Sequence, residues 1–156
     1  MTEFDLRNID KSKPVFFVGI GGISMSALAH ILKNDGYIVR GSDFKESETT
    51  QQLREMGIAV SIGHSAENVR GAGLVVYTAA VKKDNPELLE AGRLGILAIE
   101  RARLLGAMMK NYSYPVAVSG THGKTTTTSM LAHILCGAGL DPTILVGGVL
   151  PLIGGN

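Results

Sequence analysis

The segment that most constrains this chain is VSGTHGKTT at positions 118–126. It lies between an apolar run, Pro115 to Val118, and a run of helical character, Thr126 to Ala138. A strand that ends in glycines and leads through Lys-Thr into a helix typically binds the terminal phosphates of a nucleotide, because backbone N–H groups, a helix N-terminus and a lysine all face the anion. The general pattern G-x-x-x-x-G-K-[ST] has glycine where this chain has Val118, so the loop is a variant.

The residues of this loop are candidates for a nucleotide phosphate site. Lys124 would add a full positive charge beside the phosphates, and Thr125 would offer its hydroxyl to Mg²⁺. We predict Lys124 and Thr125 as the catalytic pair and Thr125 as the metal ligand. The predicted phosphate contacts are Gly120, Thr121, His122, Gly123, Lys124, Thr125 and Thr126. The alternative interpretation is a glycine turn that carries an exposed lysine.

The composition gives no indication of several classes of partner. The formal charge is only +1 over 156 residues, so nothing in the charge balance predicts nucleic acid or an anionic membrane as a partner. No apolar run approaches the roughly 18 residues of a membrane span, and residues 1–14 do not resemble a signal peptide. Cys136 is the only cysteine, which excludes an internal disulfide. We therefore expect a cytoplasmic protein.

The first part of the chain alternates between strand and helix patterns. Residues 15–18 are continuously apolar, which is typical of a strand covered on both faces in a parallel sheet. Further strands are expected at 37–39, 58–62, 74–77 and 96–98, and helical segments at 25–34, 46–56, 66–70, 86–91 and 99–109. Short connections join these segments, and this order predicts a doubly wound α/β sheet.

The polar segment 110–115 is the expected domain boundary. Behind it the strand-loop-helix pattern restarts, with strands expected at 115–118 and 143–146. The predicted domains are therefore 1–109 and 110–156. So short a second α/β unit cannot cover a parallel strand on both faces, so we expect the chain to stop inside its second domain. The uncovered strand at 115–118 predicts self-association of the chain.

A second glycine loop follows the first strand. Gly19-Ile20-Gly21-Gly22-Ile23-Ser24 matches the first two glycines of a dinucleotide fingerprint and has serine in the third glycine position. The first glycine permits the tight turn and the second lets the backbone approach a diphosphate. Asp43 follows Gly21 by 22 residues, where a carboxylate would accept hydrogen bonds from ribose hydroxyls. The alternative is a plain strand-helix turn.

The sequence resembles the Mur ligase family of peptidoglycan synthesis. The matching segments are GIGGISMSALA at 19–29, GSD at 41–43, GH at 63–64, TAAVKKDNPE at 78–87, RARLL at 101–105 and GTHGKTTTTSM at 120–130. The resemblance implies a Rossmann-like UDP-sugar domain followed by the opening of an ATPase domain. It assigns ATP and Mg²⁺ to the loop at 120–126, and the UDP diphosphate to the loop at 19–24. It also implies that Asp43 and His64 lie near the uridine, and Thr78, Ala79 and Ala80 near the rest of the UDP-sugar.

The resemblance further implies a reaction. The carboxylate of UDP-N-acetylmuramate would attack the γ-phosphate of ATP, and the amine of L-alanine would then displace phosphate from the acyl phosphate. The alternatives are a murein-peptide ligase of cell-wall recycling, which uses the same UDP-sugar, and a noncatalytic nucleotide-sugar or dinucleotide-binding module. The chain departs from the family pattern at Ser24, at Arg103 and in Thr78-Ala79-Ala80. Because the remaining domains are not in the sequence, we expect the chain alone to be inactive.

Three further histidines have plainer interpretations. His30 and His133 lie in helical runs and are expected to be partly buried structural residues. His122 is expected near the nucleotide but not on a metal, because no partner ligands occur nearby in the sequence.

Overall fold

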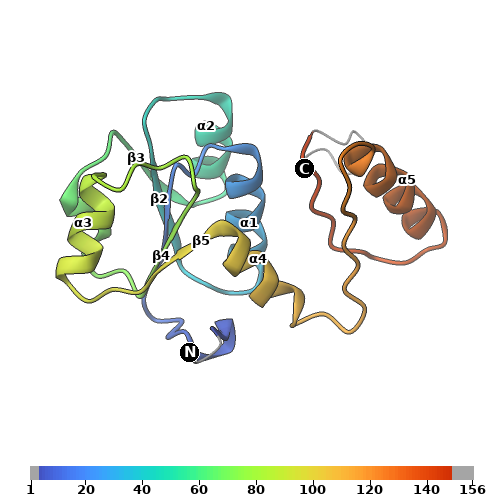
Figure 1. Ribbon diagram of the computed structural model, residues 1–156, viewed down its shortest axis with the longest axis horizontal. Coiled ribbons are helices and arrows are strands. Elements are labelled where there is room, and N and C mark those ends of the chain that lie inside the picture. Colours follow the sequence, from blue (N-terminus) through green and yellow to red (C-terminus); the bar gives the residue numbers. More distant parts are fainter. Residues whose placement is uncertain (1–3, 149–156) are drawn as a thin grey trace. The chain divides into compact units, whose positions relative to one another are not determined.

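The computed structural model describes residues 4–148 and separates into two compact units, Met1–Ser113 and Tyr114–Asn156 (Figure 1). We refer to them as unit 1 and unit 2. The division falls inside the polar segment 110–115. Within residues 4–148, none of the helices is long and apolar enough to span a membrane.

Unit 1 is built on a parallel sheet. The strands are β1 (Val15–Val18), β2 (Val39–Asp43), β3 (Ala59–Ile62), β4 (Leu74–Tyr77) and β5 (Ala98–Glu100). Their order is β3-β2-β1-β4-β5, with all neighbours parallel, so the predicted doubly wound α/β sheet is confirmed. Successive strands are added on one side of β1 up to β3, and the chain then returns to pair β4 with the other side of β1. The boundary between β1 and β4 is thus the switch point of the sheet.

Apart from the first, which was not predicted, the helices of unit 1 follow the predicted order with shifted ends. They are η1 (Leu6–Asn8), α1 (Ile23–Asn34), α2 (Glu48–Glu55), η2 (Ala66–Val69), α3 (Pro86–Arg93) and α4 (Arg101–Met109). Ser47 caps α2 in a capping box, and Asn85 caps α3 with Pro86 in its first turn. Figure 1 shows α1, α2 and α4 on one side of the sheet and α3 on the other.

Two strands were predicted too early in the chain. The strand expected at 37–39 runs over Val39–Asp43, because Tyr37 N–H closes the end of α1 on the carbonyl of Leu32 at 3.0 Å. The strand expected at 96–98 runs over Ala98–Glu100, since Ile96 N–H likewise bonds the carbonyl of Ala91 at 2.9 Å. Helix-closing turns therefore occupy the residues in which apolar character suggested a strand.

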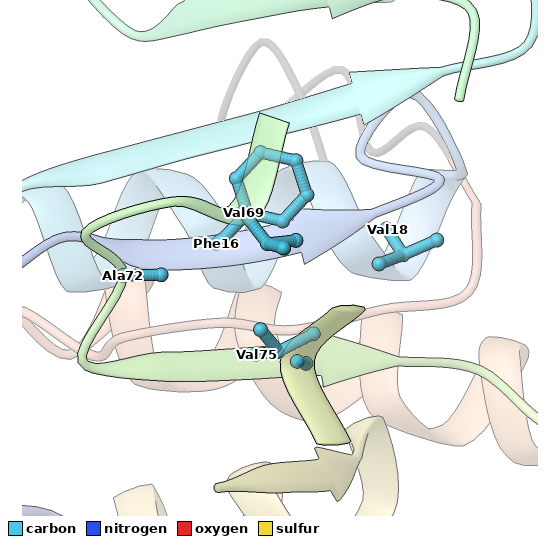
Figure 2. Packing of buried hydrophobic residues seen from close by; sticks show 6 residues of the cluster. Phe16, Val18, Val69, Ala72 and Val75 are labelled. Carbon is cyan, nitrogen blue, oxygen red and sulfur yellow. The ribbon is translucent and has the colours of Figure 1, made fainter. Parts of the chain in front are cut away.

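The core covers both faces of the central strand. All four residues of β1 are buried, as its continuous apolarity predicted. Phe16 and Val18 belong to the cluster beneath α3 and η2, which also contains Val69, Ala72, Val75 and Ala91 (Figure 2). The alternate residues of β1, Val15 and Phe17, are also fully buried, so β1 lies in the middle of two apolar layers.

Unit 2 differs from the sequence prediction. It contains α5 (Lys124–Gly137) and a small core in which Ala132 and Val146 are buried against Ile144. The strands predicted at 115–118 and 143–146 are wrong, because residues 114–148 contain no strand. A strand requires a paired neighbour, and within these residues the segments 115–118 and 143–146 do not pair with each other. The prediction of a strand before the loop at 118–126 must therefore be corrected to a segment without regular secondary structure.

Close packing at Gly41 predicts a large effect of a small substitution. A Cβ at Gly41 would lie 2.7 Å from both Ile20 Cδ1 and the carbonyl oxygen of Phe17. Since backbone atoms cannot easily retreat, Gly41→Ala should destabilise the fold by roughly 1–3 kcal/mol in urea denaturation followed by circular dichroism. Gly106→Ala is the control, because a Cβ at Gly106 in α4 has no atom within 4 Å. The control should be neutral or stabilising by up to about 1 kcal/mol; equal losses in both variants would contradict the packing argument.

Candidate functional site

The residues predicted to bind a UDP-sugar gather at one edge of the sheet. Gly19–Ser24 begins directly after β1, Asp43 ends β2, His64 follows β3, and Thr78–Ala80 follows β4. Because all the strands are parallel, their carboxyl ends meet at one edge. Ligands of open α/β sheets bind at this edge, beside the switch point. Here the glycine loop and Thr78 lie on either side of that point.

The glycine loop makes the turn that the fingerprint predicted. Gly19 has φ +78°, a left-handed conformation that favours glycine, and its carbonyl accepts a hydrogen bond from Gly22 N–H at 3.2 Å. Gly22 is the N-cap of α1 and provides no side-chain cap. The N-terminus of α1, with its partial positive charge, is therefore directed at the carboxyl edge of the sheet.

The end of β2 anchors the loops on both of its sides. The carbonyl of Ser42 accepts hydrogen bonds from Gly19 N–H at 2.8 Å and Ile20 N–H at 2.9 Å. The carbonyl of Asp43 accepts one from Gly63 N–H at 2.8 Å, in the loop that carries His64. The two consecutive carbonyls thus hold the glycine loop and the His64 loop in fixed positions.

Asp43 also binds the glycine loop through its side chain. Its Oδ2 accepts a hydrogen bond from Gly21 N–H at 2.8 Å, and its Oδ1 lies 3.4 Å from Lys45 N. The amide that the fingerprint assigns to a diphosphate is therefore occupied by a carboxylate. Oδ1 is the less strongly bound oxygen and is the one suited to a ribose hydroxyl.

His64 takes part in a buried polar network that the sequence analysis did not identify. Its Nδ1 lies 2.8 Å from Oε2 of Glu87 and 3.2 Å from Oγ of Ser42. Glu87 is fully buried, and its other oxygen accepts a hydrogen bond from Asn68 Nδ2 at 2.7 Å. Glu87 lies within the TAAVKKDNPE segment, so its position was available in the sequence, but nothing there indicated its burial.

The remaining residues at this edge are more exposed. Ala79 and Ala80 are exposed in a turn in which Val81 N–H bonds the carbonyl of Thr78 at 3.0 Å. Phe44, directly after Asp43, exposes 79% of its surface, and sequence reasoning missed it. An exposed aromatic ring beside a carboxylate at this edge is suited to stacking on a base.

In unit 2 the glycine loop at 118–126 leads directly into α5. Gly123 has φ +77° and is the N-cap of α5, which has no side-chain cap. Thr127 N–H bonds the carbonyl of Gly123 at 2.8 Å, and the amides of the first turn face outward from the helix end. Lys124 Nζ donates to the carbonyls of Gly120 at 2.5 Å and Thr121 at 3.3 Å. The ammonium group of Lys124 therefore lies over the loop that is predicted to bind the phosphates.

The fit to Mg²⁺ rests on Thr125, which is exposed in the first turn of α5. Within residues 4–148 no group of three or more His, Cys, Asp or Glu side chains could hold a metal ion. Mg²⁺ usually keeps several waters and binds the phosphates of its substrate, so a single hydroxyl beside the phosphates fits such an ion. His30 and His133, predicted to be partly buried, are exposed, so that prediction is wrong: each lies on the outer face of its helix.

Comparison with known proteins gives consistent matches. The family profile described as "Mur ligase family, catalytic domain" matches residues 14–113. The UDP-N-acetylmuramate--L-alanine ligase of Acetivibrio thermocellus is 56% identical over 156 residues, covering 100% of this chain and 33% of the relative. The chain thus spans about a third of the length of the curated relatives that it matches.

Solved structures of similar proteins agree with the fold. The UDP-N-acetylmuramate-alanine ligase of Thermotoga maritima has a TM-score of 0.86 and 40% identity, covering 92% of this chain and 34% of that one. The UDP-N-acetylmuramate:L-alanyl-gamma-D-glutamyl-meso-diaminopimelate ligase of Neisseria meningitides has a TM-score of 0.81 and 36% identity, covering 88% of this chain and 43% of that one.

The contact between Asp43 and Gly21 predicts a local effect in the protein without ligand. In Asp43→Ala the Gly21 amide loses its acceptor, so its hydrogen exchange, measured by NMR, should accelerate about tenfold or more. Asp43→Asn is the matched variant, because its amide oxygen can still accept this bond and should preserve most of the protection. Unchanged exchange at Gly21 in Asp43→Ala would show that the carboxylate does not hold the loop.

Proposed function

Since the chain belongs to the Mur ligase family, we propose that it forms the UDP-sugar-binding part of an ATP-dependent ligase that joins L-alanine to UDP-N-acetylmuramate. The observation that supports this most strongly is the identity of 53–59% to ligases of that name over 90–100% of the chain. In this proposal, residues 1–109 bind the UDP-sugar and residues 110–156 open the ATP-binding domain. The protein would act in peptidoglycan synthesis in the cytoplasm, with no nucleic acid or membrane as a partner.

In unit 1 the proposed ligand lies along the carboxyl edge of the sheet. The N-terminus of α1, with the loop Gly19–Ser24, would face the diphosphate, since a helix N-terminus favours an anion. Asp43 has one oxygen on Gly21 and would offer Oδ1 to a ribose hydroxyl. His64 would contact the uridine, and Thr78, Ala79 and Ala80 would line the sugar side.

In unit 2 the proposed ligand is ATP with Mg²⁺. Gly120 to Thr126 would surround the phosphates, and Lys124 would leave the loop carbonyls to neutralise charge on the transferred group. Thr125 would hold Mg²⁺, which supplies further positive charge to the phosphates when it is bound. The muramate carboxylate would attack the γ-phosphate, which forms an acyl phosphate and releases ADP, and the alanine amine would then displace phosphate from the acyl phosphate to form the amide.

The murein-peptide ligase is the second candidate function. It shares the UDP-sugar and differs in the incoming amine. The solved ligase from Neisseria meningitides, whose name includes a tripeptide, is 36% identical to this chain. The L-alanine ligases reach 53–59% identity, and this difference favours L-alanine.

Calorimetry tests the ligand of unit 1. We expect the chain to bind UDP-N-acetylmuramate, with weak or absent binding of ATP plus Mg²⁺ and none of NADH. Gly21→Ala places a Cβ 2.8 Å from Asp43 Oδ2, and the displaced carboxylate should weaken UDP-sugar binding about tenfold. Gly92→Ala, whose Cβ meets no atom within 4 Å, should bind as the wild type does. Binding of NADH without the UDP-sugar would refute the proposal.

Activity of the 156 residues by themselves is a separate test. They correspond to about a third of the related ligases, so we expect no phosphate release with ATP, Mg²⁺, UDP-N-acetylmuramate and L-alanine. Phosphate release that requires both the UDP-sugar and L-alanine would contradict this expectation. Lys124→Ala is the control for any background ATPase, because it removes the cation of the loop.

Self-association is predicted from exposed apolar side chains of unit 2. Met130 and Ile134 on α5 and Val116 before the loop each expose more than half of their surface. We expect sedimentation velocity to show species larger than the monomer as concentration rises, and Ile134→Ser to reduce them. A monomer at every concentration would contradict the prediction.

A further inference from the structure

Glu87 is a buried carboxylate with an unusual number of donors. It lies in the first turn of α3, its side chain is 0% exposed, and its backbone N–H donates to Oδ1 of the N-cap Asn85 at 2.9 Å. Oε1 accepts from Asn68 Nδ2 at 2.7 Å, while Oε2 lies 2.8 Å from both Ser42 Oγ and His64 Nδ1. Burial of a carboxylate is costly unless donors surround it, and here three side chains from three segments do so.

These contacts bear on which nitrogen of His64 carries a proton. An ionised Glu87 carboxylate would only accept hydrogen bonds, which would place the proton between His64 and Glu87 on Nδ1. In the neutral ring Nε2 is then an acceptor. His64 keeps 23% of its side chain exposed, and among the described residues 4–148 no group hydrogen-bonds its Nε2.

The network is directly connected to the glycine loop. Ser42 donates its hydroxyl to Glu87, and its backbone carbonyl accepts the amides of Gly19 and Ile20. Asn68 donates to the carbonyl of Gly63 at 3.2 Å as well as to Glu87, which holds the loop that carries His64. The contacts of Glu87 therefore connect the ring of His64 with both loops in one network.

We propose that Glu87 is a positioning residue that holds His64 with its proton on Nδ1 and presents Nε2 as a hydrogen-bond acceptor to the uridine of the UDP-sugar. This inference rests on the proposed function. A neutral Nε2 cannot donate to a phosphate oxygen, so the complementary groups are the imide N–H of the base and the ribose hydroxyls. Glu87 therefore acts on nucleoside recognition without touching the ligand, through His64.

The substitution that tests this is Glu87→Gln, which preserves shape. Asn68 is oriented by its bond to Gly63, so the glutamine oxygen should face Asn68 and its NH₂ group should face His64. Nδ1 must then accept a hydrogen bond, and the proton moves to Nε2. Long-range ¹H–¹⁵N NMR spectra, which distinguish the two nitrogens, should show the Nδ1–H form of His64 in the wild type and the Nε2–H form in Glu87→Gln. His64→Ala identifies the signal.

The binding experiment uses UDP and inorganic pyrophosphate with the same chain. In the wild type, UDP should shift the Nε2 resonance of His64 and pyrophosphate should not. Glu87→Gln should weaken UDP binding about tenfold in calorimetry, because Nε2 now carries a proton where an acceptor is needed. Glu90→Gln is the matched control on the same helix: Glu90 pairs with Arg93 at 2.7 Å, and this hydrogen bond lowers the pKa of its carboxyl. It should leave both the tautomer and UDP affinity unchanged.

The outcomes separate the two proposals. An Nε2–H tautomer in wild-type His64, or a Glu87→Gln variant that binds UDP as the wild type does, would overturn the role of Glu87. The wild-type spectrum gives this answer even if Glu87→Gln fails to fold. Absence of UDP binding by a wild type with the Nδ1–H tautomer would instead overturn the proposed function, and with it the presentation of Nε2 to uridine. A Nδ1–H tautomer, a UDP-specific shift and weakened binding together would support the inference.

Discussion

The parallel pairing of β1 with β2 on one side and β4 on the other is the constraint on which unit 1 depends. It buries all four residues of β1 and places the carboxyl ends of the strands at one edge. The first chain segment after β1 must then turn at once into α1, and Gly19 makes that turn in a left-handed conformation. The topology of the sheet therefore requires a tight turn at Gly19 whether or not the loop binds a ligand.

A second layer of organisation comes from the end of β2. Its backbone carbonyls hold the loops after β1 and β3, and its side chains, Ser42 and Asp43, reach Glu87 and Gly21. Ser42 binds the buried carboxylate of Glu87, and Asp43 binds the backbone amide of Gly21. Because Ser42 and Asp43 are adjacent in β2, these hydrogen bonds also fix the distance between Glu87 and Gly21. Such pre-organisation lowers the conformational-entropy cost of binding a ligand. A few polar groups that are already held in place can then select one nucleotide.

The sequence allowed prediction of features that depend on local chemistry. The glycines of the 19–24 loop, the Asn85-Pro86 start of α3 and the apolar run of β1 each follow from the residues' own conformational preferences. The extension of β2 through Gly41, Ser42 and Asp43 could not be predicted, because these residues have weak strand preferences and are strand only through pairing with β1 and β3.

The Glu87 network could not be predicted for a related reason. Ser42 and Glu87 are 45 positions apart and meet only after β2 and α3 have been placed on the same sheet. In the sequence, Glu87 is one acid in the first turn of a helix, and this is ordinary for a helix N-terminus. Its burial, and hence its importance, is a property of the tertiary structure.

The two glycine loops differ in what holds them. The loop of unit 1 is bonded to the neighbouring strand, so its shape is set by a sheet covered on both faces. The loop of unit 2 is held by Gly123 and α5, and Lys124 uses its ammonium group on the carbonyls of Gly120 and Thr121. Under the proposed function a phosphate would compete with those carbonyls for the lysine, whereas at the edge of unit 1 the side chains of Asp43 and His64 are already held by hydrogen bonds. The motif that is stronger in the sequence is therefore the less pre-organised site in the structure, and ligand binding by this chain should depend first on unit 1.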